Sequence, residues 1–265
     1  MAQLTVNGAS LACDDRGAGE PSFVFVHGWA CDRSFWAPQF EELSRDHRCL
    51  AIDLRGRGES EVVGPYHPSQ AADDVIAVMD ALGVSGAILV GHSLGGLVAL
   101  LVNERRPDLL SGIVLGDSPL DERSVAGFSR TVERVRDAGS MAPMAEWVES
   151  LFVEGTPEAV REHVRETMLG CQAEVGAGML DAGDQLSGRL DQLIRMADQK
   201  PLMAIWAEKP LGDPAHLRDI TMFLRQEPIA GSGHFFELEQ PAITNALLRA
   251  FEDDVRRDPR LEAKA

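Results

Sequence analysis

The chain has 265 residues, of which 45% are hydrophobic, so it can bury a sizeable core as one large α/β domain or two small ones. Its 25 Lys and Arg residues are outnumbered by 42 Asp and Glu residues, which gives a formal net charge of -17. A charge of this sign would repel a phosphate backbone or an anionic membrane surface. Nucleic acid and membrane are therefore not expected as partners.

The cysteines indicate the compartment and argue against a metal site. They lack the close spacing of metal ligands and the density of a disulfide framework, so we predict free thiols in a reducing environment: Cys13, Cys31, Cys49 and Cys171. Residues 1–8 lack a basic region followed by an apolar run, and no stretch approaches the roughly 18 apolar residues that a membrane span needs. We therefore expect a cytoplasmic protein without a metal.

Five short apolar runs are predicted to be buried strands, and nearly every run ends in a glycine or acidic loop. They are apolar at consecutive positions instead of alternating, which suits a sheet that is covered on both faces, as a parallel sheet is. In chain order they are residues 23–26, 50–54, 87–90, 113–115 and 202–206.

Helix-like segments separate these runs, including residues 70–82 and 94–105. Alternating strands and helices predict a parallel α/β sheet. From about residue 121 to residue 199 the sequence is charged, helix-periodic and free of strand character, after which strand character resumes. We therefore predict a core formed by residues 1–120 and 200–265, interrupted by a helical cap at residues 121–199.

The strongest functional signal is the segment Gly91-His92-Ser93-Leu94-Gly95-Gly96, which lies between a predicted strand and a predicted helix. A nucleophile on a sharp strand-to-helix turn has a strained backbone, and glycines on both sides let neighbouring chain approach without a Cβ clash. The following helix would place the positive end of its dipole near the hydroxyl. We interpret Ser93 as a nucleophile, although a Gly-Ser turn before a helix is often only a chain reversal.

Two further segments agree with this interpretation. His27-Gly28-Trp29 follows the first predicted strand, where the backbone N–H of Trp29 and that of Leu94 are predicted to form an oxyanion hole. His234 lies on a glycine-rich loop after the last strand-like run, and it is the predicted base for Ser93. The neighbouring His92 is expected to pack within the turn, whereas His47, which has no metal-ligand spacing, is expected at the surface.

With these segments the chain resembles the α/β-hydrolases, in particular the capped esterase, lactonase and C–C hydrolase group. Two more segments carry the resemblance, residues 53–60 and Glu239-Gln240-Pro241, and it covers nearly the whole chain. It implies an α/β-hydrolase fold, with a mostly parallel sheet flanked by helices and an inserted helical cap. It also implies a small-molecule substrate between cap and core and no cofactor, and it leaves a homo-oligomer open.

The acid that supports the histidine is the open part of the site. In most relatives it stands about four residues beyond the strand that ends here at Trp206, where this chain has Pro210. Asp213 follows three residues later, and Asp117 lies at the end of an earlier strand. Asp117 is favoured because some relatives, including cofactor-free dioxygenases of heteroaromatic substrates, are similar in taking the acid from that earlier strand. Asp213 is the alternative acid, and Glu208 comes third.

The resemblance favours a serine hydrolase that cleaves a small carboxylic ester or lactone through an acyl-enzyme on Ser93. A C–C bond hydrolase or a cofactor-free dioxygenase could use nearly the same residues. Haloalkane dehalogenases and epoxide hydrolases are disfavoured, because these relatives carry aspartate in place of Ser93. A small-molecule receptor without turnover is the non-enzyme alternative, since a fold by itself does not establish catalysis.

Overall fold

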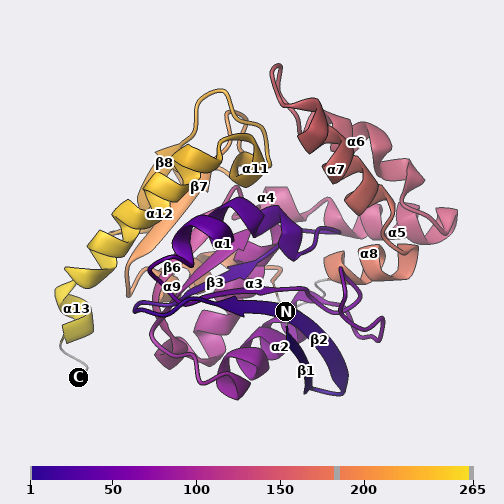
Figure 1. Cartoon of the computed structure of the whole chain (residues 1–265). Coiled ribbons are helices and arrows are strands. Elements are labelled where there is room, and N and C mark those ends of the chain that lie inside the picture. The colour runs from indigo at the N-terminus through magenta and orange to yellow at the C-terminus, as the bar shows by residue number, and fades with distance from the viewer. Residues whose placement is uncertain (1, 182–185, 263–265) are drawn as a thin grey trace.

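An eight-stranded sheet forms the centre of the computed structural model, which describes residues 2–181 and 186–262. The strand order is β1-β2-β4-β3-β5-β6-β7-β8 (Figure 1). Strands β3 to β8 run parallel, whereas β2 runs antiparallel to both of its neighbours. The predicted, mostly parallel α/β sheet is thereby confirmed. The strands are β1 (Ala2–Val6), β2 (Ala9–Arg16), β3 (Phe23–Val26), β4 (Cys49–Ile52), β5 (Ala87–His92), β6 (Leu110–Gly116), β7 (Leu202–Trp206) and β8 (Arg225–Pro228).

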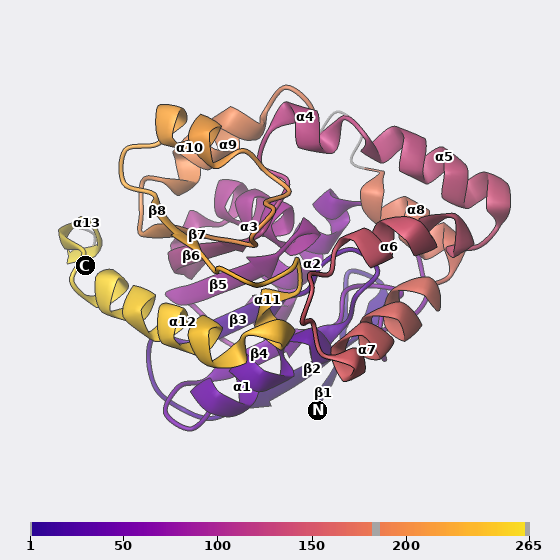
Figure 2. The same cartoon turned by 90° about the horizontal axis from the view of Figure 1, so that it is seen from above.

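Helices cover both faces of this sheet. Figure 2 shows α1 and α12 on one face and α3 and α9 on the other. The helices that follow the main strands are α1 (Ala37–Leu43), α2 (Pro68–Ala81), α3 (Leu94–Arg105), α9 (Leu190–Ala197), α10 (Pro214–Ile220), α11 (Phe236–Glu239), α12 (Pro241–Arg256) and α13 (Pro259–Glu262), with short 3-10 turns η1 (Arg33–Trp36) and η2 (Pro107–Leu109).

The strands are apolar at consecutive positions because each face is buried against its own layer of helices. In β5, Leu89 belongs to the core that includes residues of α2 and α3, whereas Ile88 and Val90 belong to the core that includes residues of α1 and α12. The helix α3 is itself almost wholly buried, since it packs against the sheet, α2 and α9. The carboxyl ends of the parallel strands therefore meet at one edge of a rigid, two-sided core.

Between β6 and β7 every regular element in the described residues is a helix. These elements are α4 (Glu122–Val125), α5 (Phe128–Ala138), η3 (Ala142–Met144), α6 (Ala145–Ser150), α7 (Glu158–Leu169), α8 (Ala173–Leu180) and α9. Both views show α5 to α8 together at one side of the sheet, whereas α9 lies beside α3 (Figures 1 and 2). The division of the chain into a core and a separate cap stays a prediction, and residues 182–185 of the proposed cap lie outside the described residues.

The N-terminal pair β1 and β2 has no counterpart among the predicted strands. The edge strand β1 alternates between half-buried and exposed positions, so it lacks the continuous apolar run of a central strand. It is held by its ladder to β2, in which Ala2 pairs with Cys13 and Val6 with Ala9. Edge strands of this kind are stabilised by pairing, which a search for apolar runs does not detect.

The predicted surface position of His47 is wrong, because this histidine is buried. Its ring packs edge-on against Phe23, with 5.1 Å between ring centroids. Its Nδ1 lies 3.2 Å from the carbonyl oxygen of Pro21, and its Nε2 lies 3.1 Å from Oε2 of Glu252 on α12. Local sequence gave no sign of these partners, which come from distant parts of the chain.

No helix in the described residues is long and apolar enough to cross a membrane. All four cysteines are free and buried.

A buried ion pair joins the N-terminal hairpin to α2. Arg55 donates to both carboxylate oxygens of Asp74, with Nε–Oδ2 at 2.6 Å and Nη2–Oδ1 at 2.8 Å. Arg55 also donates to the carbonyl oxygen of Asn7, and the Asn7 amide donates to Asp74. Both charged side chains are buried, so each depends on the other for its hydrogen bonds.

We predict that Arg55→Met lowers the free energy of unfolding by about 3 to 5 kcal/mol, because it leaves the Asp74 carboxylate buried without its cation. Chemical denaturation would measure the change. The control Arg45→Met removes a solvent-exposed pair with Glu42 and should change stability by less than about 1 kcal/mol. Equal effects of the two substitutions would contradict the assigned role of Arg55.

Candidate active site

Ser93 stands on a turn whose backbone is strained. Strand β5 ends at His92 and α3 begins at Leu94, and Ser93 between them has φ 52° and ψ -116°. Strain at a non-glycine residue in this region typically destabilises the fold by about 1–3 kcal/mol, and contacts of the surrounding structure must offset it. Here the Ser93 N–H donates to the carbonyl oxygen of Gly116 on β6, at 2.7 Å.

Glycines make this turn possible. A Cβ atom at Gly91 would lie 2.2 Å from the carbonyl oxygen of Gly95, and one at Gly95 would lie 2.3 Å from that of Val26. Contacts this short exclude any side chain at either position. The turn therefore packs directly against the end of β3.

Asp117 and His234 are brought together at the same edge of the sheet. Asp117 follows β6 and has φ 38°, and its N–H donates to the carbonyl oxygen of Ile205 on β7 at 2.7 Å. Its Oδ2 lies 2.6 Å from Nδ1 of His234, and its Oδ1 accepts longer bonds of 3.3 Å from the N–H groups of Ala207 and Leu211. Because a carboxylate oxygen can only accept, Nδ1 of His234 carries the hydrogen of this bond.

The other two candidate acids lie elsewhere. Asp213 is exposed and caps α10, accepting from the N–H groups of Ala215 and His216, and these bonds lower the pKa of its carboxyl. Glu208 accepts from the N–H of Gly231 at 2.9 Å, and its own N–H donates to the carbonyl oxygen of Ser232. Glu208 thus fastens the loop that carries His234, while Asp117 contacts the imidazole.

The predicted oxyanion-hole residues flank Ser93 in space. Leu94 is the first residue of α3, and Trp29 follows the end of β3. A Cβ at Gly28 would lie 3.2 Å from the Cβ of Ser93, so the absence of a side chain there lets the loop of Trp29 lie against the turn. Trp29, Ser93 and Leu94 line one cavity.

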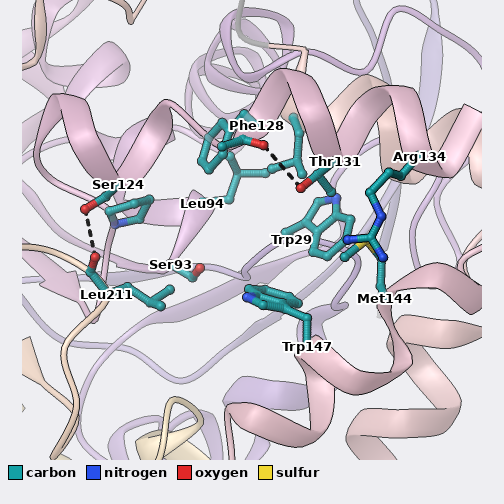
Figure 3. A pocket seen from close by; sticks show the side chains of 13 residues that line it. Trp29, Ser93, Leu94, Ser124, Phe128, Thr131, Arg134, Met144, Trp147 and Leu211 are labelled. Carbon is teal, nitrogen blue, oxygen red and sulfur yellow. Dashed lines mark hydrogen bonds between the residues drawn. The ribbon is translucent and has the colours of Figure 1, made fainter.

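This cavity has a volume of about 240 Å³. That is below the roughly 300–1,000 Å³ of drug-sized ligand pockets, which favours a small ligand. Figure 3 shows its mixed origin, because the strand-end residues Trp29 and Ser93 face residues of the helical segment such as Phe128 and Trp147. The cavity is lined by Trp29, Ser93, Leu94, Pro119, Ser124, Gly127, Phe128, Thr131, Arg134, Met144, Trp147, Leu180 and Leu211. In the described residues no group of His, Cys, Asp or Glu is arranged to hold a metal ion.

A buried polar pair lies behind Ser93, and sequence reasoning missed one of its members. His92 packs within the turn as expected, and its Nε2 lies 2.9 Å from the main-chain carbonyl oxygen of His234, so Nε2 carries a hydrogen and donates. Its Nδ1 lies 3.4 Å from Oε1 of Glu237. Glu237, on α11, stands among the apolar residues Phe235, Phe236 and Leu238, and only that unusual setting could have drawn attention to it.

The pKa of each member of this pair is shifted in the direction that favours the neutral form. Burial, together with the nearby His234, keeps the pKa of His92 well below its usual value. Burial raises the pKa of the Glu237 carboxyl well above its usual value, and the carboxylates of Glu239 and Asp117 raise it further. In the described residues neither Nδ1 of His92 nor either carboxyl oxygen of Glu237 has a hydrogen-bond partner. The hydrogen bond from Nε2 of His92 holds the main chain of His234 beside the turn.

Comparisons with known proteins identify the family of the chain. A family model described as "Alpha/beta hydrolase family" matches residues 23–247. An epoxide hydrolase of Caballeronia sordidicola is 34% identical over 140 residues, which make up 51% of this chain and 41% of that protein. The chain spans about half the length of most curated relatives that it matches.

Two solved structures cover nearly the whole chain. A thermophilic esterase from Thermogutta terrifontis has a TM-score of 0.84 at 26% identity, over 96% of this chain and 99% of that one. The enol-lactonase from Burkholderia xenovorans LB400 has a TM-score of 0.85 at 24% identity, over 95% of this chain and 100% of that one. Because its identity is 24%, the likeness to the enol-lactonase shows a shared fold alone.

We predict that Glu237→Gln removes a pH-dependent loss of stability. The pKa of Glu237 is raised in the native state. Its contribution to the free energy of unfolding is therefore fully present below the usual glutamate pKa of 4.5 and is lost as pH rises toward the native pKa. An amide of the same shape does not titrate. The unfolding free energy of the variant relative to wild type should therefore rise with pH above about pH 5, by up to about 1.4 kcal/mol per unit.

Denaturant titrations between pH 5 and about pH 8 would measure this difference. The control Glu41→Gln, at an exposed position on α1, should follow the wild-type profile. A constant difference between Glu237→Gln and wild type across this range would show that Glu237 is already ionised.

Proposed function

Since the chain belongs to the alpha/beta hydrolase family, we propose that it is a serine hydrolase that cleaves a small carboxylic ester or lactone through an acyl-enzyme on Ser93. The observation that carries the proposal is the 2.6 Å hydrogen bond between Asp117 and His234, beside the strained turn of Ser93. The same turn contributes His92, which binds the main chain of His234.

In the proposed reaction, Nε2 of His234 takes the proton of the Ser93 hydroxyl as Oγ attacks the substrate carbonyl carbon. The carbonyl oxygen becomes an oxyanion, which accepts hydrogen bonds from the backbone N–H groups of Trp29 and Leu94. Leu94 begins α3, so the helix dipole adds to this stabilisation. His234 then gives its proton to the leaving alcohol. Water, activated by the same imidazole, hydrolyses the acyl-enzyme and releases the acid.

Asp117 has two roles in this proposal. Its carboxylate holds the proton of His234 on Nδ1, which leaves Nε2 free to act as the base. It also stabilises the imidazolium that forms during the attack. The proposed steps need no metal or organic cofactor, because the charge that develops is met by backbone donors and by Asp117.

The position of Asp117 favours one further candidate activity, that of a cofactor-free dioxygenase. Asp117 follows β6, and the cofactor-free dioxygenases of heteroaromatic substrates are similar in taking their acid from that strand. Oxygen consumption with a hydroxyquinolone would identify such an activity, whereas a C–C bond hydrolase would release a carboxylic acid without consuming oxygen. A receptor would bind ligand without turnover. Epoxide hydrolases are similar to this chain but carry aspartate at the position of Ser93. The residue at this position therefore distinguishes the chain from them.

We predict that Ser93→Ala lowers kcat on p-nitrophenyl esters by at least about 10⁴-fold while the fold is retained, since the hydroxyl is the proposed nucleophile. A fluorophosphonate should label wild-type protein at Ser93 and should not label the variant. Ser124→Ala is the matched control, because Ser124 is another hydroxyl that lines the same cavity. Labelling that disappears in the Ser124 variant, or persists in Ser93→Ala, would remove Ser93 as the nucleophile.

A second prediction tests the acid: Asp117→Asn should reduce kcat by on the order of 10⁴-fold, because the amide favours the wrong tautomer of His234. Asp213→Asn should change kcat by less than about fivefold, since asparagine also caps helices well and the site is exposed. Both variants would be assayed on one ester after circular dichroism has verified folding. The reverse pattern would make Asp213 the acid and leave the proposed roles of Ser93 and His234 intact.

A further inference from the structure

The cavity at Ser93 contains one charged side chain. Of the 13 residues that line it, all of them within the described part of the chain, only Arg134 carries a charge. It stands on α5 in a protein whose formal net charge is -17. A cation at the reaction cavity of so acidic a chain needs an explanation.

Arg134 is not neutralised by the protein. Its one hydrogen bond in the described structure runs from Nη2 to the carbonyl oxygen of Pro143, at 2.8 Å. The acidic neighbours Glu133 and Asp137 on the same helix form no ion pair with it in the described residues. Arg136, two residues later on α5, does pair with a carboxylate, that of Asp181 at 3.2 Å. Arg134 therefore keeps most of its donors and all of its charge for another partner.

Two hydroxyls of the cavity lining are engaged within the protein. The hydroxyl of Ser124 lies 2.5 Å from Oδ2 of Asp121 and 2.8 Å from the carbonyl oxygen of Leu211, and that of Thr131 donates to the carbonyl oxygen of Gly127 at 3.3 Å. Arg134 is the only charged side chain among the lining residues, so it is the group best suited to recognise a charged group of a ligand away from Ser93.

Two indoles line the cavity together with Ser93 and Arg134. Figure 3 shows Ser93 on one side and Arg134 on the other, with the indoles of Trp29 and Trp147 between them in this view. These rings pack edge-to-face, with centroids 5.4 Å apart. Arg134 itself is solvent-exposed. A ligand that reaches from Ser93 to Arg134 would pass an apolar middle section.

We propose that the substrate carries a carboxylate remote from the bond that is cleaved, and that the guanidinium of Arg134 binds this carboxylate. The inference rests on the proposed function, since it takes the cleaved bond to be an ester or lactone at Ser93. The planar guanidinium matches a carboxylate by two parallel N–H···O bonds. The substrate class is therefore a half-ester of a short dicarboxylic acid, or a lactone with a carboxylate side chain.

The test compares matched charged and neutral esters. The charged substrates are the monoethyl esters of succinate, glutarate and adipate, and the neutral ones are ethyl butanoate, pentanoate and hexanoate. Ethanol release gives kcat and KM for each. Wild type should prefer at least one half-ester over its neutral partner, and this preference should shrink as salt is added, because salt screens an exposed charge.

Arg134→Gln should lower kcat/KM for the preferred half-ester by about fivefold to tenfold, mainly through KM, since it removes one charge-assisted contact. Its effect on the neutral partner should be much smaller, and Arg134→Lys should retain part of the preference. The control Arg130→Gln removes a charge one turn earlier on α5, at an exposed position outside the cavity lining, and should leave both substrates unaffected. Equal losses on charged and neutral esters, or no loss on either, would overturn the assignment of Arg134.

A binding experiment separates this inference from the proposed function. Calorimetry with Ser93→Ala protein and monoethyl glutarate measures recognition without turnover. Binding that is lost in the Ser93→Ala, Arg134→Gln double variant supports the carboxylate site even if wild type hydrolyses no ester. Binding that is unchanged by the Arg134 substitution, or absent at millimolar concentrations from the Ser93→Ala protein, overturns it.

Discussion

The close approach of main-chain segments around Ser93 is the constraint on which the rest of the site depends. Gly91 and Gly95 lie so near to one another and to the end of β3 that neither can carry a side chain. Ser93 between them has a positive φ of 52°, and the turn lies beside the carboxyl ends of β3 and β6. Parallel strands end at one edge, so the groups that follow β3, β5 and β6 all converge on the Ser93 side chain.

The same edge also limits how many charges can be buried there. Asp117 lies fully buried against His234, and a second carboxylate nearby would be costly. Burial raises the pKa of Glu237, and the nearby Glu239 and Asp117 raise it further, which favours the protonated carboxyl. Nδ1 of His92 lies 3.4 Å from Glu237 without a hydrogen bond, while Nε2 of His92 donates to the main chain of His234. The position of the imidazole thus depends on Asp117 at its ring and on His92 at its main chain.

The helical segment between β6 and β7 determines what the strained turn faces. Met144, Trp147 and Arg134 come from this segment, and they complete a cavity that β3 and β5 only begin. The segment adds apolar walls and a single cation to the lining. In the proposed function the reacting groups follow strands of the sheet, whereas the helical segment selects the substrate.

Local features of the sequence were sufficient for much of this description. Consecutive apolar residues predicted the central strands, because a strand buried on both faces needs no partner to be recognised. The glycines around Ser93 predicted its turn, since a positive φ and a close approach are properties of a few adjacent residues. The edge strand β1, by contrast, has no such pattern and depends on its pairing with β2.

By itself, then, the sequence determined the class of sheet, the turn of Ser93, and the two aspartates that could serve His234. Only the tertiary structure decided which aspartate reaches the imidazole, because that 2.6 Å contact depends on how β6 and the loop after β8 are placed across β7. It also decided that His47 is buried, that Glu237 lies behind Ser93, and that Arg134 faces the cavity. Each of these contacts joins residues far apart in the chain, and no local pattern of residues encodes such a distance.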